Sequence, residues 1–127
     1  MNNISIIEFI KKSPKAELHL HIEGTLEPEQ MFSFAKRNNV QIPFKNINEA
    51  KKAYNFSNLE SFLKIYYEGA KVLLREKDFF ELTWAYALKC KEDNIVHTEI
   101  FFDPQTHTNR GISFDIIING IYKAFKK

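Results

Sequence analysis

Residues 15–24 read Lys-Ala-Glu-Leu-His-Leu-His-Ile-Glu-Gly, and this stretch says most about the fold. Apolar and polar residues alternate strictly from Ala16 to Ile22, which predicts a β-strand because successive strand side chains point to opposite faces. The alternation predicts one face made of Ala16, Leu18, Leu20 and Ile22, and an opposite face made of Glu17, His19, His21 and Glu23.

His19 and His21 lie on the polar face of this predicted strand. Residues two apart on a strand point the same way, with α-carbons roughly 6.5 Å apart, so two imidazoles can converge on one divalent ion. A half-exposed strand with two surface histidines has the same spacing. Spacing alone therefore leaves metal binding and plain surface exposure both open.

The remaining sequence alternates between helix and strand patterns. Proline and capping signals, together with apolar spacing, predict helices over residues 6–10, 28–38, 48–54, 57–74, 78–93 and 113–125, the fourth opened by a capping box from Ser57 to Glu60. Ile95 to Phe102 predicts a second strand, which ends at Asp103-Pro104. On the last helix the apolar stripe is Phe114, Ile117, Ile118, Ile121 and Phe125.

This order of elements is typical of an α/β fold with parallel strands joined by right-handed crossovers. Two strands cannot close a barrel, and a barrel of alternating strands and helices typically needs about 250 residues. Residues 1–127 are therefore expected to form one incomplete α/β domain, the amino-terminal fragment of a barrel.

The composition excludes several classes of function. The chain is 44% hydrophobic and 27% charged with a net charge of +2, and its lysines are scattered, so no nucleic-acid or membrane partner is expected. Cys90, the single cysteine, cannot form an internal disulfide and is expected to be an inert core thiol. With no secretory signal, these features predict a soluble, cytoplasmic domain.

Three stretches resemble the adenosine and adenine deaminase family of the amidohydrolase superfamily. They are Pro14–Pro28, Asn58–Leu63 and Asn94–Thr108, and they follow the family's order over nearly the whole chain. The resemblance implies the amino-terminal part of a (β/α)₈ TIM barrel with one bound zinc ion, Zn²⁺. Zinc lowers the pKa of a bound water to about 7, and the resulting hydroxide displaces the exocyclic amino group of a purine as ammonia.

The resemblance implies that His19 and His21 are two of the metal ligands, because they match the two ligands on the family's first strand. Glu23 stands where nucleoside deaminases commonly carry an aspartate that contacts the ribose. A longer side chain there would intrude on the space of the sugar, as in the branch of the family that acts on the free base. The stretch Phe101–Thr108 also resembles that branch, so adenine is favoured over adenosine as the substrate.

Phe62, Leu63 and Tyr66 match the helix that gives the family's pocket an apolar gate, with plain helix-to-barrel packing as the simpler alternative. Asp103, at the carboxyl end of the second strand, is expected to border the same pocket. Two further histidines receive structural interpretations. His97 is expected to be packed or hydrogen-bonded, and His107 to be exposed in a polar loop.

The family's proton-shuttle glutamate, water-orienting histidine and remaining metal ligands come from later strands, and this sequence contains none of them. Two ligands are fewer than the three that zinc sites use, so the 127-residue chain alone is expected to be inactive. The alternatives are an adenosine deaminase, or a non-catalytic remnant that acts as an interaction protein and self-associates through exposed strand edges.

Overall fold

The computed structural model describes residues 5–127 and shows a two-stranded parallel sheet flanked by helices. In chain order the elements are α1 (Ile6–Lys12), β1 (Lys15–His21), the 3₁₀ turn η1 (Ile22–Thr25), α2 (Pro28–Asn38), α3 (Ile47–Ala53), α4 (Leu59–Ala70), α5 (Glu76–Glu92), β2 (Ile95–Phe101), α6 (Pro104–Thr108) and α7 (Phe114–Phe125). The predicted α/β order and the parallel pairing of the two strands are confirmed.

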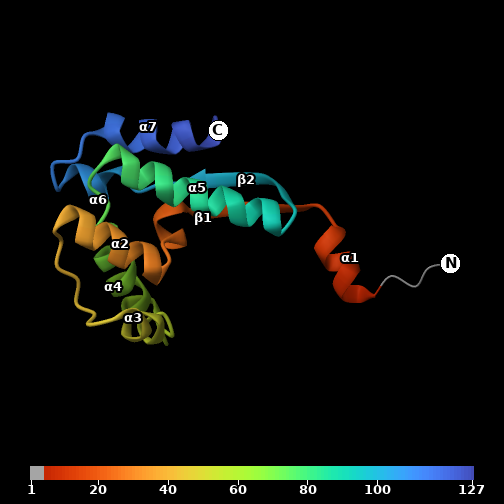
Figure 1. Cartoon of the computed structure of the whole chain (residues 1–127), viewed down its shortest axis with the longest axis horizontal. Coiled ribbons are helices and arrows are strands. Elements are labelled where there is room, and N and C mark those ends of the chain that lie inside the picture. Colours follow the sequence, from red (N-terminus) through yellow and green to blue (C-terminus); the bar gives the residue numbers. More distant parts are fainter. Residues whose placement is uncertain (1–4) are drawn as a thin grey trace.

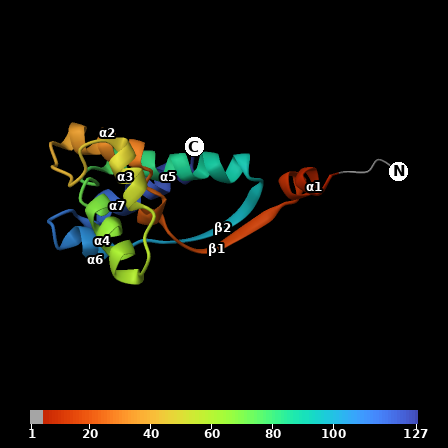
Figure 2. The same ribbon diagram turned by 90° about the horizontal axis from the view of Figure 1, so that it is seen from below.

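The helices divide into two groups around the sheet (Figure 1). Helices α5 and α7 lie side by side, while α2, α3 and α4 gather where the strands end. Helix α1 projects from the other end of the sheet (Figure 2). Its apolar residues are exposed. The carboxyl ends of both strands therefore face a cluster of helices. Within residues 5–127, no helix is long and apolar enough to cross a membrane.

A bulge in β1 changes the predicted assignment of faces. The register with β2 shifts between Glu17 and Leu20, and His19 has a φ of 64°. Because an extra residue in one strand reverses the alternation, Glu17 faces α5, where the Tyr86 hydroxyl donates to its carboxylate at 2.6 Å. Leu18 is 61% exposed instead of buried. The predicted alternation is therefore wrong before the bulge, whereas Leu20 and Ile22 pack toward the core after it.

The sequence misplaces one cap and misses one helix. Helix α4 is capped by Asn58, whose side chain accepts from the Ser61 amide at 2.9 Å, so the capping box predicted from Ser57 lies one residue further on. The stretch after Asp103 was predicted as loop, but Pro104 opens the short helix α6. Asn and Ser are both favoured helix caps, so the local sequence does not decide between Ser57 and Asn58 as the cap of α4. Proline suits the first turn of a helix as well as a loop, so Pro104 does not decide between the two structures.

Helix α7 packs on α5 through a close contact at Gly120. A Cβ built there would lie 2.5 Å from the Glu76 carbonyl oxygen and 2.7 Å from Phe79 Cβ. The buried face of α7 therefore turns toward Gly120 and Ala124 together with Ile117 and Ile121. Phe114 and Phe125, which the predicted stripe placed in the core, are 49% and 47% exposed.

Replacing Gly120 with alanine is expected to destabilise the fold by about 1–3 kcal/mol, even though alanine is the better helix former, because backbone of α5 blocks the new methyl group. Chemical denaturation of the full-length gene product measures the effect. Asn119→Ala, at the exposed neighbouring position, is the matched control. Equal stability of the two variants would show that the helices separate without cost.

Candidate metal and substrate site

His19 and His21 converge at the carboxyl end of β1. Their ring centroids are 5.6 Å apart, and the Phe101 ring of β2 lies 4.7 Å from His19 and 5.8 Å from His21. Both histidines line a cavity of about 350 Å³ whose other walls are Leu20, Gly24, Phe62, Leu63, Tyr66, Tyr67 and Asp103. The structure thus brings the predicted site residues to the wall of a single cavity, with the exception of Glu23.

The donor chemistry of this end of β1 fits a zinc ion in part. Asp103 Oδ1 lies 3.4 Å from His21 Nδ1, which leaves Nε2 of the ring for a metal. Metal-bound histidines commonly have a carboxylate on their other ring nitrogen, since it fixes the orientation of the ring. Among residues 5–127 no group of three or more metal-binding side chains comes together. The described residues therefore suit two positions of a zinc site that needs at least a third protein ligand.

Glu23 lies in η1 just behind the cavity and is 3% exposed. Its Oε1 accepts hydrogen bonds from the Asp103 amide at 2.9 Å and from His107 Nε2 at 3.0 Å. Its Oε2 accepts from the Tyr66 hydroxyl at 3.2 Å. These donors offset the cost of burying the carboxylate, and they hold Glu23 in one place.

His107 is fully buried, so the prediction of an exposed loop residue is wrong. It lies on α6, where its ring packs edge-on against Phe79 at 4.9 Å, and Arg110 Nη2 lies 2.8 Å from its Nδ1. A guanidinium can only donate, so Nδ1 accepts and Nε2–H donates to Glu23. Arg110 also donates to the Ala70 and Leu73 carbonyl oxygens, which ties this group to the end of α4.

Tyr66 connects Glu23 to the cavity wall. The single proton of its hydroxyl is shared between Asp103 Oδ2 at 2.6 Å and Glu23 Oε2 at 3.2 Å, and the shorter distance favours Asp103. Burial raises the pKa of Tyr66, and so do the neighbouring carboxylates of Asp103 and Glu23. The phenol therefore remains a neutral donor at physiological pH. Tyr66 therefore makes polar contacts with Asp103 and Glu23, which its predicted place in an apolar gate did not include.

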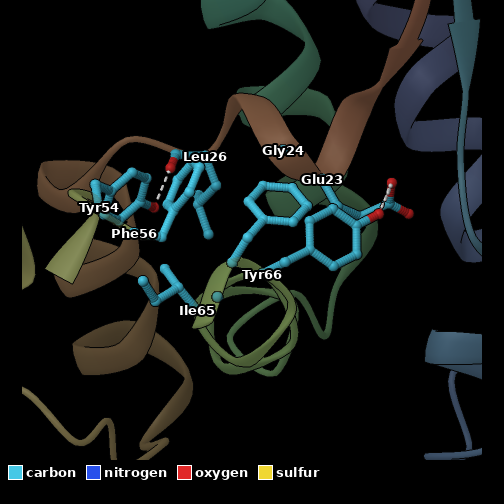
Figure 3. Close-up of a pocket in the computed structure, with 9 residues that line it drawn as sticks. Glu23, Gly24, Leu26, Tyr54, Phe56, Ile65 and Tyr66 are labelled. Atoms are coloured by element: carbon cyan, nitrogen blue, oxygen red, sulfur yellow. Dashed lines mark hydrogen bonds between the residues drawn. The ribbon is translucent and has the colours of Figure 1, made fainter. Parts of the chain in front are cut away.

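A second cavity of about 180 Å³ lies on the other side of Tyr66 and Phe62. Figure 3 shows Tyr66 and Ile65 of α4 facing Glu23, Gly24 and Leu26 across it. Tyr54 closes one end by donating to the Leu26 carbonyl oxygen at 2.6 Å, and burial raises the pKa of Tyr54 to about 12. Phe62 and Tyr66 line both cavities, and their role as a gate stays a prediction.

The sequence missed His107 and Arg110 as parts of the site. Their only local signal was a spacing of three residues, which places two side chains on one face of a helix. This spacing has no such meaning in a loop, which is the structure that the sequence predicts for this segment. His97 shows the opposite error, because its side chain is 61% exposed rather than packed and lies 3.6 Å from Glu99. Cys90 is buried and free, as predicted.

Comparisons with known proteins identify relatives of this chain. The family model for adenosine deaminase matches residues 14–127. The chain is 64% identical over 120 residues to an adenine deaminase of Wolinella succinogenes and 63% identical over 119 residues to one of Acinetobacter baylyi, in each case covering 94% of this chain and 36% of the relative. It thus spans little more than a third of the length of these relatives.

Solved structures agree with the sequence matches. The crystal structure of an adenine deaminase from Arthrobacter aurescens superposes with a TM-score of 0.85 at 44% identity, over 89% of this chain and 35% of that one. An amidohydrolase of Burkholderia ambifaria with bound zinc shares the fold at a TM-score of 0.75 and 22% identity, over 98% of this chain and 36% of that one. The predicted fold class, a partial α/β fragment of a TIM barrel, is thus confirmed. With its two histidines at the end of the first strand and a family match over nearly its whole length, the chain belongs to the adenosine deaminase family.

Proposed function

We propose that the protein carrying this chain is a zinc-dependent adenine deaminase, which converts adenine and water to hypoxanthine and ammonia. The observation that carries the proposal is the convergence of His19 and His21 in one cavity beside Asp103. Its support is the 44–64% identity to proteins named adenine deaminase. A purine small molecule is the proposed partner.

In this proposal each described residue has a stated task. His19 and His21 hold the zinc ion, which when bound supplies a hydroxide at neutral pH. Asp103 orients the His21 ring through Nδ1. Phe62 and Leu63 form an apolar wall that excludes water around the base. Glu23 is buried behind this cavity rather than on its wall, so its task in the proposal is to hold Asp103 and Tyr66 in place, not to occupy the space of a ribose.

The described residues also limit what the chain can do. They supply two metal ligands, whereas catalytic zinc sites use three, so the 127-residue chain alone is proposed to be inactive. The free thiol of Cys90 suits a reducing compartment, and the proposed place of action is the cytoplasm. Self-association through the edges of the two-stranded sheet stays a prediction.

Ammonia release by the purified full-length gene product tests the function. Adenine is expected to be turned over at least tenfold more efficiently than adenosine, and chelation of zinc is expected to abolish the reaction until zinc is restored. Adenosine deaminase is the second candidate, because the family model carries that description. Equal or better turnover of adenosine would favour it, and no turnover of either purine by zinc-loaded protein would overturn both.

A further inference from the structure

His107 is a buried histidine that the proposed chemistry does not yet use. It is fully buried, and its two ring nitrogens have separate partners, Arg110 at Nδ1 and Glu23 at Nε2. Because Arg110 can only donate, the ring is held as the Nε2–H tautomer. His107 thus delivers one defined hydrogen bond to Glu23 from behind the cavity.

Glu23 passes this constraint on to Asp103. The oxygen that accepts from His107 also accepts from the Asp103 amide at 2.9 Å, which fixes the backbone where β2 ends. The other oxygen lies 3.2 Å from the Tyr66 hydroxyl, which shares its single proton between Glu23 and Asp103 Oδ2 at 2.6 Å. Asp103 is therefore held at both its backbone and its side chain.

Asp103 is the member of this group that reaches the cavity. Its side chain is 33% exposed and lines the same space as His19 and His21. Its Oδ2 faces Tyr66, while the nearest side-chain donor to Oδ1 among residues 5–127 is His21 Nδ1 at 3.4 Å. An ionised carboxylate only accepts hydrogen bonds, so a ligand that contacts Oδ1 must bring a donor.

We propose that His107 and Glu23 are positioning residues that hold Asp103 so that its carboxylate accepts a hydrogen bond from the ring N–H of a free purine base. The inference rests on the proposed function. A free base carries a proton on its five-membered ring, whereas a nucleoside has the sugar in its place. The carboxylate therefore selects the base by a donor that the nucleoside lacks, in addition to any restriction of space.

The test compares adenine with 9-methyladenine, which lacks the ring N–H but adds only a methyl group. In the full-length gene product, adenine is expected to have a kcat/KM at least tenfold higher, because a site built around a hydrogen bond rejects a ligand that cannot make it. His107→Phe is expected to lower kcat/KM for adenine by about 10- to 100-fold, mainly through KM, and to change 9-methyladenine much less. His107→Gln, which keeps a donor, should restore most of the preference. Thr108→Ala, exposed on the same helix, should leave it intact.

A binding measurement provides a readout independent of turnover. By calorimetry, wild type is expected to bind hypoxanthine at least tenfold more tightly than 9-methylhypoxanthine, and His107→Phe to lose most of that ratio. An equal loss of affinity for both ligands in His107→Phe would overturn the proposal. His107 would then have a structural role, or it would help to orient His21, in which case the variant would also contain less zinc. Retention of the full ratio in His107→Phe would also overturn it. Failure of the proposed function is distinct, since wild type would then neither deaminate adenine nor bind hypoxanthine.

Discussion

Replacing His21 with alanine is expected to remove zinc from the full-length gene product and to lower adenine deamination at least 1000-fold, an effect on the order of 4 kcal/mol in the barrier. His21 and His19 are the two imidazoles that converge in the cavity, and within residues 5–127 no third metal-binding side chain joins them. A site that loses one of so few protein ligands no longer holds the ion that activates water. Zinc content by mass spectrometry and ammonia release measure the two effects together.

His97→Ala is the matched control for this experiment. His97 lies on β2 opposite Ala16, at the far end of the sheet from His21, and its side chain is 61% exposed. This variant is expected to keep its zinc and its activity. If His21→Ala kept stoichiometric zinc and more than a tenth of wild-type activity, His21 would not be a ligand.

Replacing Asp78 with alanine is expected to destabilise the fold by about 3–5 kcal/mol, the cost of breaking a buried ion pair. Asp78 is fully buried at the start of α5. Its carboxylate accepts from the Leu74 and Arg75 amides at 3.0 and 2.8 Å. It also pairs with the Arg37 guanidinium and accepts from Asn38 at 2.7 Å, so that it ties α2 to α5.

Denaturation by urea measures the loss, with Asp115→Ala as control. Asp115 lies in the first turn of α7 and is exposed, so its removal is expected to cost less than about 1 kcal/mol. A comparable loss in the two variants would show that the Asp78 ion pair contributes no more than a surface charge.

The same carboxylate gives a pH dependence of stability. Burial by itself would raise the pKa of Asp78, but the hydrogen bonds from the Leu74 and Arg75 amides and the Arg37 guanidinium outweigh it and hold the pKa below its ordinary value. Its contribution is therefore complete above about pH 4, the unfolded value, and is lost as the pH falls through the folded value. Wild type is expected to lose stability below pH 4 more steeply than Asp78→Ala. Parallel slopes in the two proteins would contradict this.

The sequence sufficed for the main elements because their signals are local. The alternation before Gly24, the β-formers of residues 95–101 and the apolar spacing of α4 and α5 all gave elements that the structure contains. His19 and His21 were found together because a two-residue spacing on a strand brings side chains to one face.

The remaining features depend on contacts between distant segments. The bulge at His19 follows from the register with β2, and Glu17 turns to Tyr86, 69 residues away. His107 meets Glu23 across 84 residues, so no window of sequence around either residue predicts their contact. The interface between α5 and α7 contains Gly120 and not the predicted Phe125. The backbone of α5 comes so close at Gly120 that a side chain has no room there.

Crystallography of the zinc-loaded full-length gene product, with anomalous data collected at the zinc edge, tests the central claim most directly. The account predicts one strong anomalous peak bonded to a ring nitrogen of both His19 and His21, with Asp103 next to the other nitrogen of His21. A fully occupied zinc site elsewhere in the protein, with both histidines free of metal, would contradict it.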